Sequence, residues 1–435
     1  MNETIVQIME RELIPALGCT EPMAFGLVAA AARRYAPGEI KEIHVEGSPS
    51  MIKGVQYVKI PRSGGLRGGK VASAMGAVGG DHTLDMQVFD PVTPEDVKKA
   101  VALAESGAVT VDKVDADRKL YLKATVVATE GTGTAIIQDL HNNICYLEQD
   151  GKVILDNRRP AAVSSEITED MPDYSILNVN TIYDFCKNAP LSSFGIIEKT
   201  IQITKTTSED GMNNPYGLEV GRNLRNAAGK SVLGNDVAMQ AVMWGAAGVD
   251  ARMGGSGFPA MSNSGSGNQG ITCSMPVIAV AEYLGKTHEE MVRAVAVSNL
   301  LTIFVKTHFD VNYGRMAPVC CAAVAAGGAG AGVAFLYGAT ADELTRILQS
   351  VLGSVAGLFC DGAKSNCALK VAMALQAAMQ SLVLAKAGYA PNEVDGIVGH
   401  TVEETIDNFF LIQKKGMPNI EDVLCEIEAA KEQEC

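Results

Sequence analysis

Two cysteines near the end of the chain, Cys360 and Cys367, bracket the short polar loop in "LFCDGAKSNCALKVAMALQAAM". A continuous helix would separate these two thiols by ~10.5 Å, which is wide for neighbouring ligands of one small cluster. The residues between them are turn formers, so the pattern predicts a compact loop that gathers both sulfur atoms at the start of the next helix. Thiolates gathered in this way bind zinc or iron-sulfur clusters.

A site of this kind needs at least one more ligand, and the adjacent cysteines Cys320 and Cys321 are the natural donors. Lys306, His308 and Arg315 lie just upstream of this pair, in "FVKTHFDVNYGRMAPVCCAAVAAGGAGAG". A lone histidine such as His308 is more often an ordinary hydrogen-bonded residue than a ligand. Three thiolates with no obvious histidine partner favour an iron-sulfur centre over structural zinc, although the spacing alone leaves both open.

A further cysteine, Cys19, lies in "GCTEP" near the start of the chain. Thr20 can cap a following helix, Glu21 faces the helix dipole and Pro22 suits the first turn. The dipole at a helix N-terminus lowers the pKa of a nearby thiol, so Cys19 is a candidate reactive thiolate. The alternative is a buried structural cysteine.

The stretch "GGSGFPAMSNSGSGNQGIT" (254–272) is rich in Gly, Ser and Asn and carries no charged residue. Backbone amides and short hydroxyls in such a segment can converge on an anion. The stretch fits neither nucleotide-binding glycine pattern, and its lack of charge argues against a flexible surface loop. We therefore predict a carboxylate-binding loop, with these candidate ligands: Ser264, Ser266, Asn268 and Gln269.

Lys53 follows a small-residue turn in "GSPSMIKGVQYVKIPRSGG" and precedes a predicted strand. It invites a second interpretation, in which Lys53 forms a Schiff base with pyridoxal phosphate and the 254–272 loop holds the phosphate. An ordinary lysine on an edge strand is the commoner case.

The segments that position these residues differ between the two ends of the chain. Alternating patterns predict strands in two runs between 39 and 61 and at least three more between 119 and 157. Helical patterns cover 2–14 and the capped segment "TPEDVKKAVALAESG". From about 171 onward, Ala-rich segments of helical length dominate.

We therefore predict an α+β fold. Residues 1–170 are expected to form a mixed α/β domain that contains the GCTEP helix, and residues 171–435 a largely helical domain that holds the cluster.

Charge and composition exclude several classes of protein. The net charge of -14 opposes phosphate backbones and anionic membrane surfaces, so we expect no nucleic-acid partner. The N-terminal sequence lacks the features of a secretory signal, and ten cysteines are few for a disulfide framework in a chain this long. We expect a cytoplasmic protein with free thiols.

One uncharged stretch, 316–341, imitates a membrane span. Alanine and glycine dominate it, whereas membrane insertion is driven by larger apolar residues, and the mean hydropathy of the chain is only +0.12. We predict a buried helical hairpin here, with a membrane helix as the alternative.

In this order along nearly the whole chain, "GCTEP", "SNSGSGNQG", "CCAAVAAGGAGAG" and "CDGAKSNCALK" resemble motifs of the serine dehydratase alpha-chain-like family, and specifically its L-cysteine desulfidase branch. The resemblance implies a pyridoxal-independent lyase with an oxygen-sensitive 4Fe-4S cluster, which converts L-cysteine and water to pyruvate, ammonia and sulfide. Related enzymes that act on L-serine share the cluster.

The resemblance also implies roles for single residues. Cys320, Cys360 and Cys367 would hold the cluster and leave one iron open to the substrate. Relatives commonly read Cys-Gly-Cys where this chain reads Cys320, Cys321 and Ala322, so Cys321 receives no role.

Elimination requires a base that removes the α-proton of the substrate, and an open iron can act as a Lewis acid toward the leaving group. Cys19 is our first choice for the base, followed by Lys306 and His308. Lys53 and Arg315 join the 254–272 loop as candidate ligands of the small amino-acid substrate. A non-catalytic thiol-binding or metal-storage protein remains the rival outside enzymes, and a homo-oligomer is compatible with this interpretation.

Overall fold

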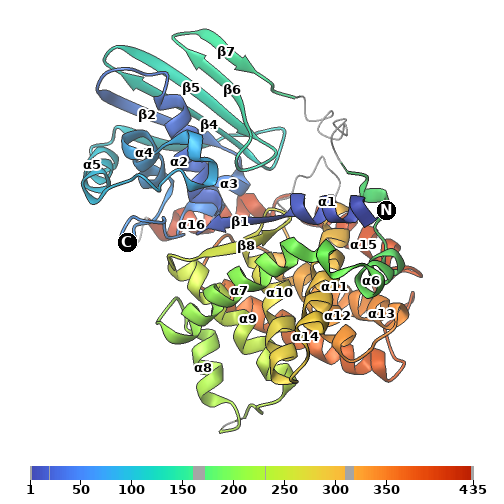
Figure 1. The fold of residues 1–435 in the computed structure, drawn as a ribbon. Coiled ribbons are helices and arrows are strands. Elements are labelled where there is room, and N and C mark those ends of the chain that lie inside the picture. The colour runs from blue at the N-terminus through green and yellow to red at the C-terminus, as the bar shows by residue number, and fades with distance from the viewer. Residues whose placement is uncertain (1, 19, 160–171, 231, 309–317, 433–435) are drawn as a thin grey trace.

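The computed structural model describes residues 2–18, 20–159, 172–230, 232–308 and 318–432. A sheet-bearing part, built by the first third of the chain, lies against a larger body of helices in the lower half of Figure 1. Each part has its own apolar core. The predicted α+β class, mixed in the N-terminal part and largely helical in the C-terminal part, is confirmed.

The sheet has one covered face. In β4 (Tyr121–Ala128) every second side chain is buried, which is the period of two expected of a strand covered on one side. The strand order is β3-β2-β4-β5-β6-β7, with β2 and β3 parallel and the other neighbours antiparallel. The strands predicted between 119 and 157 are present. The remaining strands are β2 (Ile40–Gly47), β3 (Val109–Lys113), β5 (Gly131–Gln138), β6 (Ile144–Gln149) and β7 (Lys152–Asp156).

Helix α2 (Thr20–Arg33) fills the space between the sheet and α4 (Gly69–Gly79), and nearly all of its residues are buried. Glycine permits this approach, because a Cβ on Gly76 would stand 2.1 Å from the carbonyl oxygen of Gly26. Next along the chain lie η1 (His82–Gln87) and α5 (Pro94–Glu105), the second of which has the predicted threonine cap.

The prediction of a second strand between 39 and 61 was wrong. Residues 56–61 contain only an isolated bridge between Lys59 and Arg67, and the segment before them, which was predicted as a turn, forms the short helix α3 (Pro49–Val55). Ser48 is extended and Pro49 occupies the first turn, a position that suits proline because its missing N–H has no partner there. Lys53 therefore lies on a helix and not on an edge strand.

The N-terminal segment packs on the helical body. Ile5, Ile8 and Met9 of α1 (Asn2–Glu12) belong to the core of that body. The predicted helix ends two residues early, because the chain continues as β1 (Leu13–Leu17), which pairs antiparallel with β8 (Pro259–Asn263). The predicted domain boundary at 170/171 falls among residues 160–171, outside the described residues, and stays a prediction.

Besides α1, β1 and β8, the helical body contains the helices from residue 174 onward. They are η3 (Tyr174–Ile176), α6 (Val179–Asn188), η4 (Leu191–Phe194), α7 (Gly195–Asn213), α8 (Val220–Ala227), α9 (Val237–Gly254), α10 (Gly267–Tyr283), α11 (His288–Thr307), α12 (Cys321–Leu336), α13 (Ala341–Val355), α14 (Cys367–Lys386), α15 (Val402–Leu411), η6 (Ile412–Gly416) and α16 (Ile420–Glu432).

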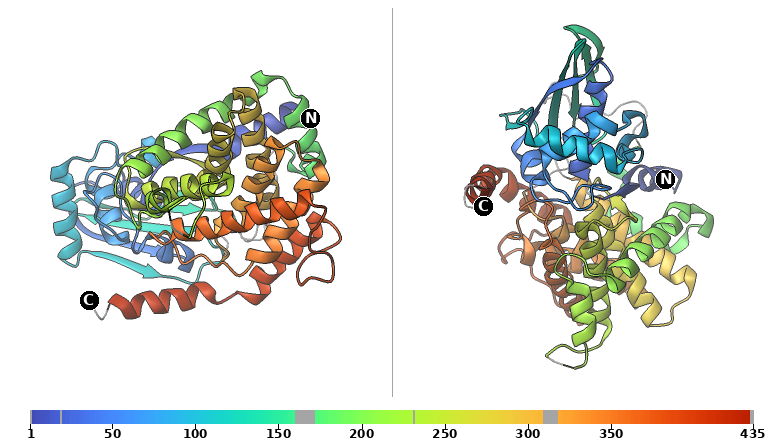
Figure 2. Two further views of the ribbon diagram at one scale, coloured as in Figure 1. Left: turned by 90° about the horizontal axis from the view of Figure 1, so that it is seen from below. Right: turned by 90° about the vertical axis from the view of Figure 1, so that its left-hand side faces the viewer.

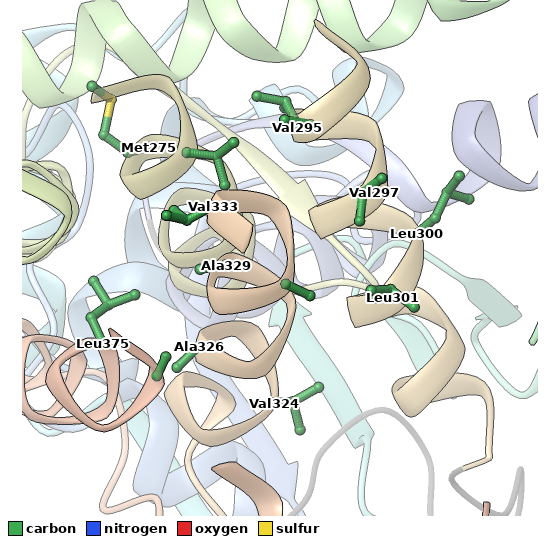
Figure 3. Close-up of a cluster of buried hydrophobic side chains, with 14 of the residues drawn as sticks. Met275, Val295, Val297, Leu300, Leu301, Val324, Ala326, Ala329, Val333 and Leu375 are labelled. Atoms are coloured by element: carbon green, nitrogen blue, oxygen red, sulfur yellow. The ribbon is translucent and has the colours of Figure 1, made fainter. Parts of the chain in front are cut away.

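Helix α12 lies at the centre of this body (Figure 3). Its Ala and Gly residues let α10, α11, α13 and α14 approach closely. A Cβ on Gly328, for example, would stand 2.2 Å from the hydroxyl oxygen of Thr302. The predicted burial of this uncharged stretch is therefore confirmed, but its described part contains one helix, α12, and not a hairpin, because the partner helix α13 begins only at Ala341.

One helix of the described residues, α14, is long and apolar enough to cross a membrane by length and composition. Half of its most apolar window is buried against the other helices, and a core helix passes the same test. Such a helix is weak evidence for a membrane span.

The last helix, α16, connects the two parts. It extends from the helical body along the sheet-bearing part, as the left view in Figure 2 shows, and packs on α3. Its acidic residues Glu421 and Asp422 bond to lysines of the sheet-bearing part.

Candidate active site

Cys320 and Cys360 lie on two neighbouring extended segments. Val319 and Phe359 form an antiparallel bridge between these segments. The backbone N–H of Cys320 donates to the carbonyl of Leu358 at 2.7 Å, and that of Cys360 to the carbonyl of Pro318 at 2.6 Å. The structure thus brings together two cysteines that are forty positions apart in the sequence.

The loop from Cys360 to Cys367 is compact. The Cys367 thiol lies 3.6 Å from the carbonyl oxygen of Gly362 and accepts from the backbone N–H of Lys364 at 3.5 Å. Gly362 has φ +89°, and a Cβ there would stand 2.6 Å from the carbonyl oxygen of Lys53. The fold of the loop therefore depends on glycine at this position.

The thiols lie at helix N-termini. Cys320 is the N-cap of α12, Cys321 is the first residue of that helix, and Cys367 is the first residue of α14. The positive end of a helix dipole stabilises a thiolate or another negatively charged group. Electrostatic interactions connect all three of these thiols with Cys360.

The protonation of the thiols follows from burial and from their contacts. Burial raises the pKa of Cys367 to about 12 and also raises that of Cys360. The hydrogen bond with Cys321 holds the pKa of Cys320 well above its usual value. That same bond lowers the pKa of Cys321, with help from the Ser266 hydroxyl and the charges of Lys306 and Arg252.

The donors are of the chemical type that an iron-sulfur cluster takes, because all of them are thiols. Buried thiols with raised pKa values keep their protons unless a metal cation displaces them. Among the described residues, no group of three His, Cys, Asp or Glu side chains is arranged so that it could hold one metal ion. The ligands of a cluster bind separate iron atoms, so they lie farther apart than the ligands of one zinc ion.

The predicted carboxylate loop is largely buried and forms β8 and the start of α10, so it is not a surface loop. Ser266 is the N-cap of α10 and accepts from the N–H of Gln269 at 3.3 Å. The Gln269 side chain turns inward and donates to the Asn263 carbonyl and side-chain oxygens at 3.1 and 3.2 Å. The Ser264 hydroxyl donates to the same side-chain oxygen. Gln269 and Ser264 therefore hold the turn, and their predicted contact with substrate stays a prediction.

The Asn268 side chain bonds to Arg252, a residue that the sequence did not single out. Its Oδ1 accepts from Nη1 of Arg252 at 3.0 Å. Arg252 lies in the last turn of α9 and is buried beside the thiols. One signal was available in the sequence, because Arg252 is followed by a run without charge that extends to residue 281.

Lys53 lies beside the thiol site. Its ammonium donates to the carbonyl of Cys360 at 3.1 Å and to Oε1 of the buried Glu421 at 3.2 Å. Burial acts to lower the pKa of Lys53, but the charges of Cys360 and Glu421 outweigh it, so the pKa is raised. A Schiff-base lysine needs a neutral amine, and this environment favours the charged form, which argues against the pyridoxal phosphate interpretation.

The remaining predicted residues have mixed placements. Lys306, in the last turn of α11, lies close enough to Cys321 to lower the pKa of that thiol. His308 follows it, with Nδ1 3.0 Å from the carbonyl oxygen of Phe304. His308 forms no hydrogen bond with a thiol of the described residues. Cys19 and Arg315 lie outside the described residues.

Comparison with known proteins gives the affiliation of the chain. The family model described as "Serine dehydratase alpha chain" matches residues 84–426. A "UPF0597 protein" of Clostridium perfringens is 33% identical over 429 residues, which cover 98% of both chains. Another, from Oleidesulfovibrio alaskensis, is 35% identical over 426 residues, which cover 98% of this chain and 97% of the relative.

Proposed function

The chain belongs to the serine dehydratase alpha chain family, and on that premise we propose that it is an iron-sulfur lyase that acts on L-cysteine. The reaction converts L-cysteine and water to pyruvate, ammonia and hydrogen sulfide. A reducing compartment such as the cytoplasm would suit the free thiols.

One observation supports the proposal most strongly. Thiols from two distant segments of the chain lie together at the N-termini of α12 and α14. Cys320, Cys360 and Cys367 would hold a 4Fe-4S cluster, in line with the family resemblance. When bound on three thiolates, such a cluster supplies an iron with an open coordination position, a Lewis acid toward the leaving sulfur.

The residues of the chain would bind the substrate and move its protons. The start of α10, with Ser266 and Asn268, offers donors for the substrate carboxylate. A thiolate base, Cys19 in our proposal, takes the α-proton, and the electron pair of the broken C–H bond forms the C=C bond as the C–S bond breaks and hydrosulfide leaves. The enamine product tautomerises to an imine, and water hydrolyses it to pyruvate and ammonia.

L-Serine is the second candidate substrate, because its hydroxyl can leave from the same position and the family is described by that activity. Pyridoxal phosphate has less support, since the Lys53 ammonium is bound by Glu421.

The test is a product assay on protein purified without oxygen. We expect L-cysteine to yield sulfide and pyruvate in equal amounts, with turnover lost on exposure to air and partly restored by iron and sulfide. Zinc would not show this behaviour, because it has no redox chemistry. Pyruvate from L-serine alone would move the assignment to the dehydratase. Iron without any pyruvate would favour the metal-storage alternative.

A further inference from the structure

Arg252 is a buried cation that has no acidic partner among the described residues. The residue is 7% exposed, and it forms no ion pair with any Asp or Glu of these residues. Nη1 donates to Oδ1 of Asn268, whereas Nε is buried and finds no acceptor in the described part of the chain. A charge buried with an unfilled donor is strongly destabilising, so this guanidinium requires another partner.

The guanidinium also lies at the positive end of a helix. A Cβ on Gly267, the first residue of α10, would stand only 2.4 Å from Nε of Arg252, so the guanidinium packs directly on the first turn. The N-terminus of a helix favours anions and disfavours cations. An anion would satisfy all three features, because it pairs with the cation, interacts favourably with the helix N-terminus and accepts a hydrogen bond from Nε.

We propose that Arg252 and the first turn of α10 form the site that binds the α-carboxylate of the amino-acid substrate. Asn268 occupies Nη1, so the edge formed by Nε and Nη2 remains for the two carboxylate oxygens. The planar guanidinium matches a carboxylate in this bidentate geometry. The identity of the ligand as an amino acid rests on the proposed function, whereas the requirement for an anion does not.

The position of Arg252 directs the reacting end of the substrate toward the thiols. Arg252 lies close enough to Cys321 for its charge to act on that thiol, and the hydroxyl of Ser266, the N-cap of α10, lies within hydrogen-bonding reach of the same thiol. The β-carbon of an amino acid is two bonds from its carboxylate carbon. A substrate anchored at Arg252 therefore carries its β-substituent beside the cysteines.

Binding of L-alanine, measured by anaerobic calorimetry on the iron-loaded protein, tests the anchor without turnover. L-Alanine has the substrate skeleton without a leaving group, and L-alaninamide lacks the carboxylate. We expect the wild type to bind L-alanine and not L-alaninamide. Arg252→Gln should weaken L-alanine binding about 10²-fold, the effect of losing hydrogen bonds between charged groups, with unchanged cluster absorption. Arg252→Lys should bind with intermediate affinity.

Two further variants keep the test valid if Arg252→Gln does not fold. Gly267→Ala should displace the guanidinium and weaken L-alanine binding. Its control Gly195→Ala, at the start of α7, where an added Cβ meets nothing within 4 Å, should not. Asn268→Asp should neutralise the guanidinium. We expect this variant to melt at a higher temperature and to bind L-alanine more weakly, opposite shifts that a purely structural role would not produce.

The outcomes separate this inference from the proposed function. Arg252-dependent binding of L-alanine supports the anchor even if no lyase activity is found. Turnover of L-cysteine by the wild type, together with unchanged L-alanine binding in Arg252→Gln, would overturn the anchor alone. A wild type that binds L-alanine and L-alaninamide equally, or neither of them, would also overturn it.

Discussion

Replacement of Cys320, Cys360 or Cys367 by alanine, one at a time, is expected to abolish both iron content and turnover. These thiols come from segments that only the fold brings together, and each would bind a different iron of the cluster. Loss of one thiolate leaves an iron without its ligand, and metal binding is coupled to the local fold of the loop. The measurement is iron and acid-labile sulfide per chain, with pyruvate formation, on variants purified without oxygen.

Cys186→Ala provides the matched control. Cys186 is a buried cysteine of the same helical body, and burial raises the pKa of its thiol. None of the cysteines of the thiol site affects that pKa, so this variant should retain iron, sulfide and turnover. A Cys360→Ala protein with a full cluster would show that the assignment of ligands is wrong.

Cys19→Ser is expected to keep iron and sulfide near wild-type amounts and to lose turnover by at least ~10², the usual contribution of a general base. A hydroxyl is a far weaker acid than a thiol, so serine cannot supply the base at neutral pH. The start of α2 is near the thiol site, because the charge of Glu21 acts on the Cys360 thiol. The measurement combines kcat with the electron paramagnetic resonance of the cluster, before and after addition of L-cysteine.

The control for this variant is Cys425→Ser. Cys425 is a half-buried cysteine on α16 whose thiol lies 3.7 Å from the carbonyl oxygen of Pro49, and we expect normal turnover after its replacement. Two results for Cys19→Ser would contradict our account. Protein purified without iron would make Cys19 a ligand, and normal turnover would leave the base to another residue such as Lys306.

Local patterns predicted the local elements well. The threonine cap of α5 and the strands β4 to β7 need only contacts between residues near in sequence. The helix α3 was missed because its small residues were interpreted as a turn before a strand, and Pro49 was the signal that favoured a helix. The compact loop between Cys360 and Cys367 was predicted because its turn residues are local as well.

The surroundings of the site depend on distant contacts, and these were not predictable. Lys53 bonds to the carbonyl of Cys360, 307 positions away, and to Glu421, 368 positions away. A periodic pattern in the sequence does not show contacts between residues so far apart. Lys53 was therefore interpreted only from the residues next to it in the sequence. Arg252 was overlooked for the same reason, because its importance arises from packing against Gly267.

Iron and acid-labile sulfide, measured in wild-type protein purified without oxygen, test the central claim most directly. Our account predicts about four iron and four sulfide per chain, with an electron paramagnetic resonance spectrum of the reduced cluster that changes when L-cysteine is added. The change is expected because an iron open to substrate alters its ligands on binding. Protein that is active with L-cysteine but contains zinc, or no metal, would contradict the account.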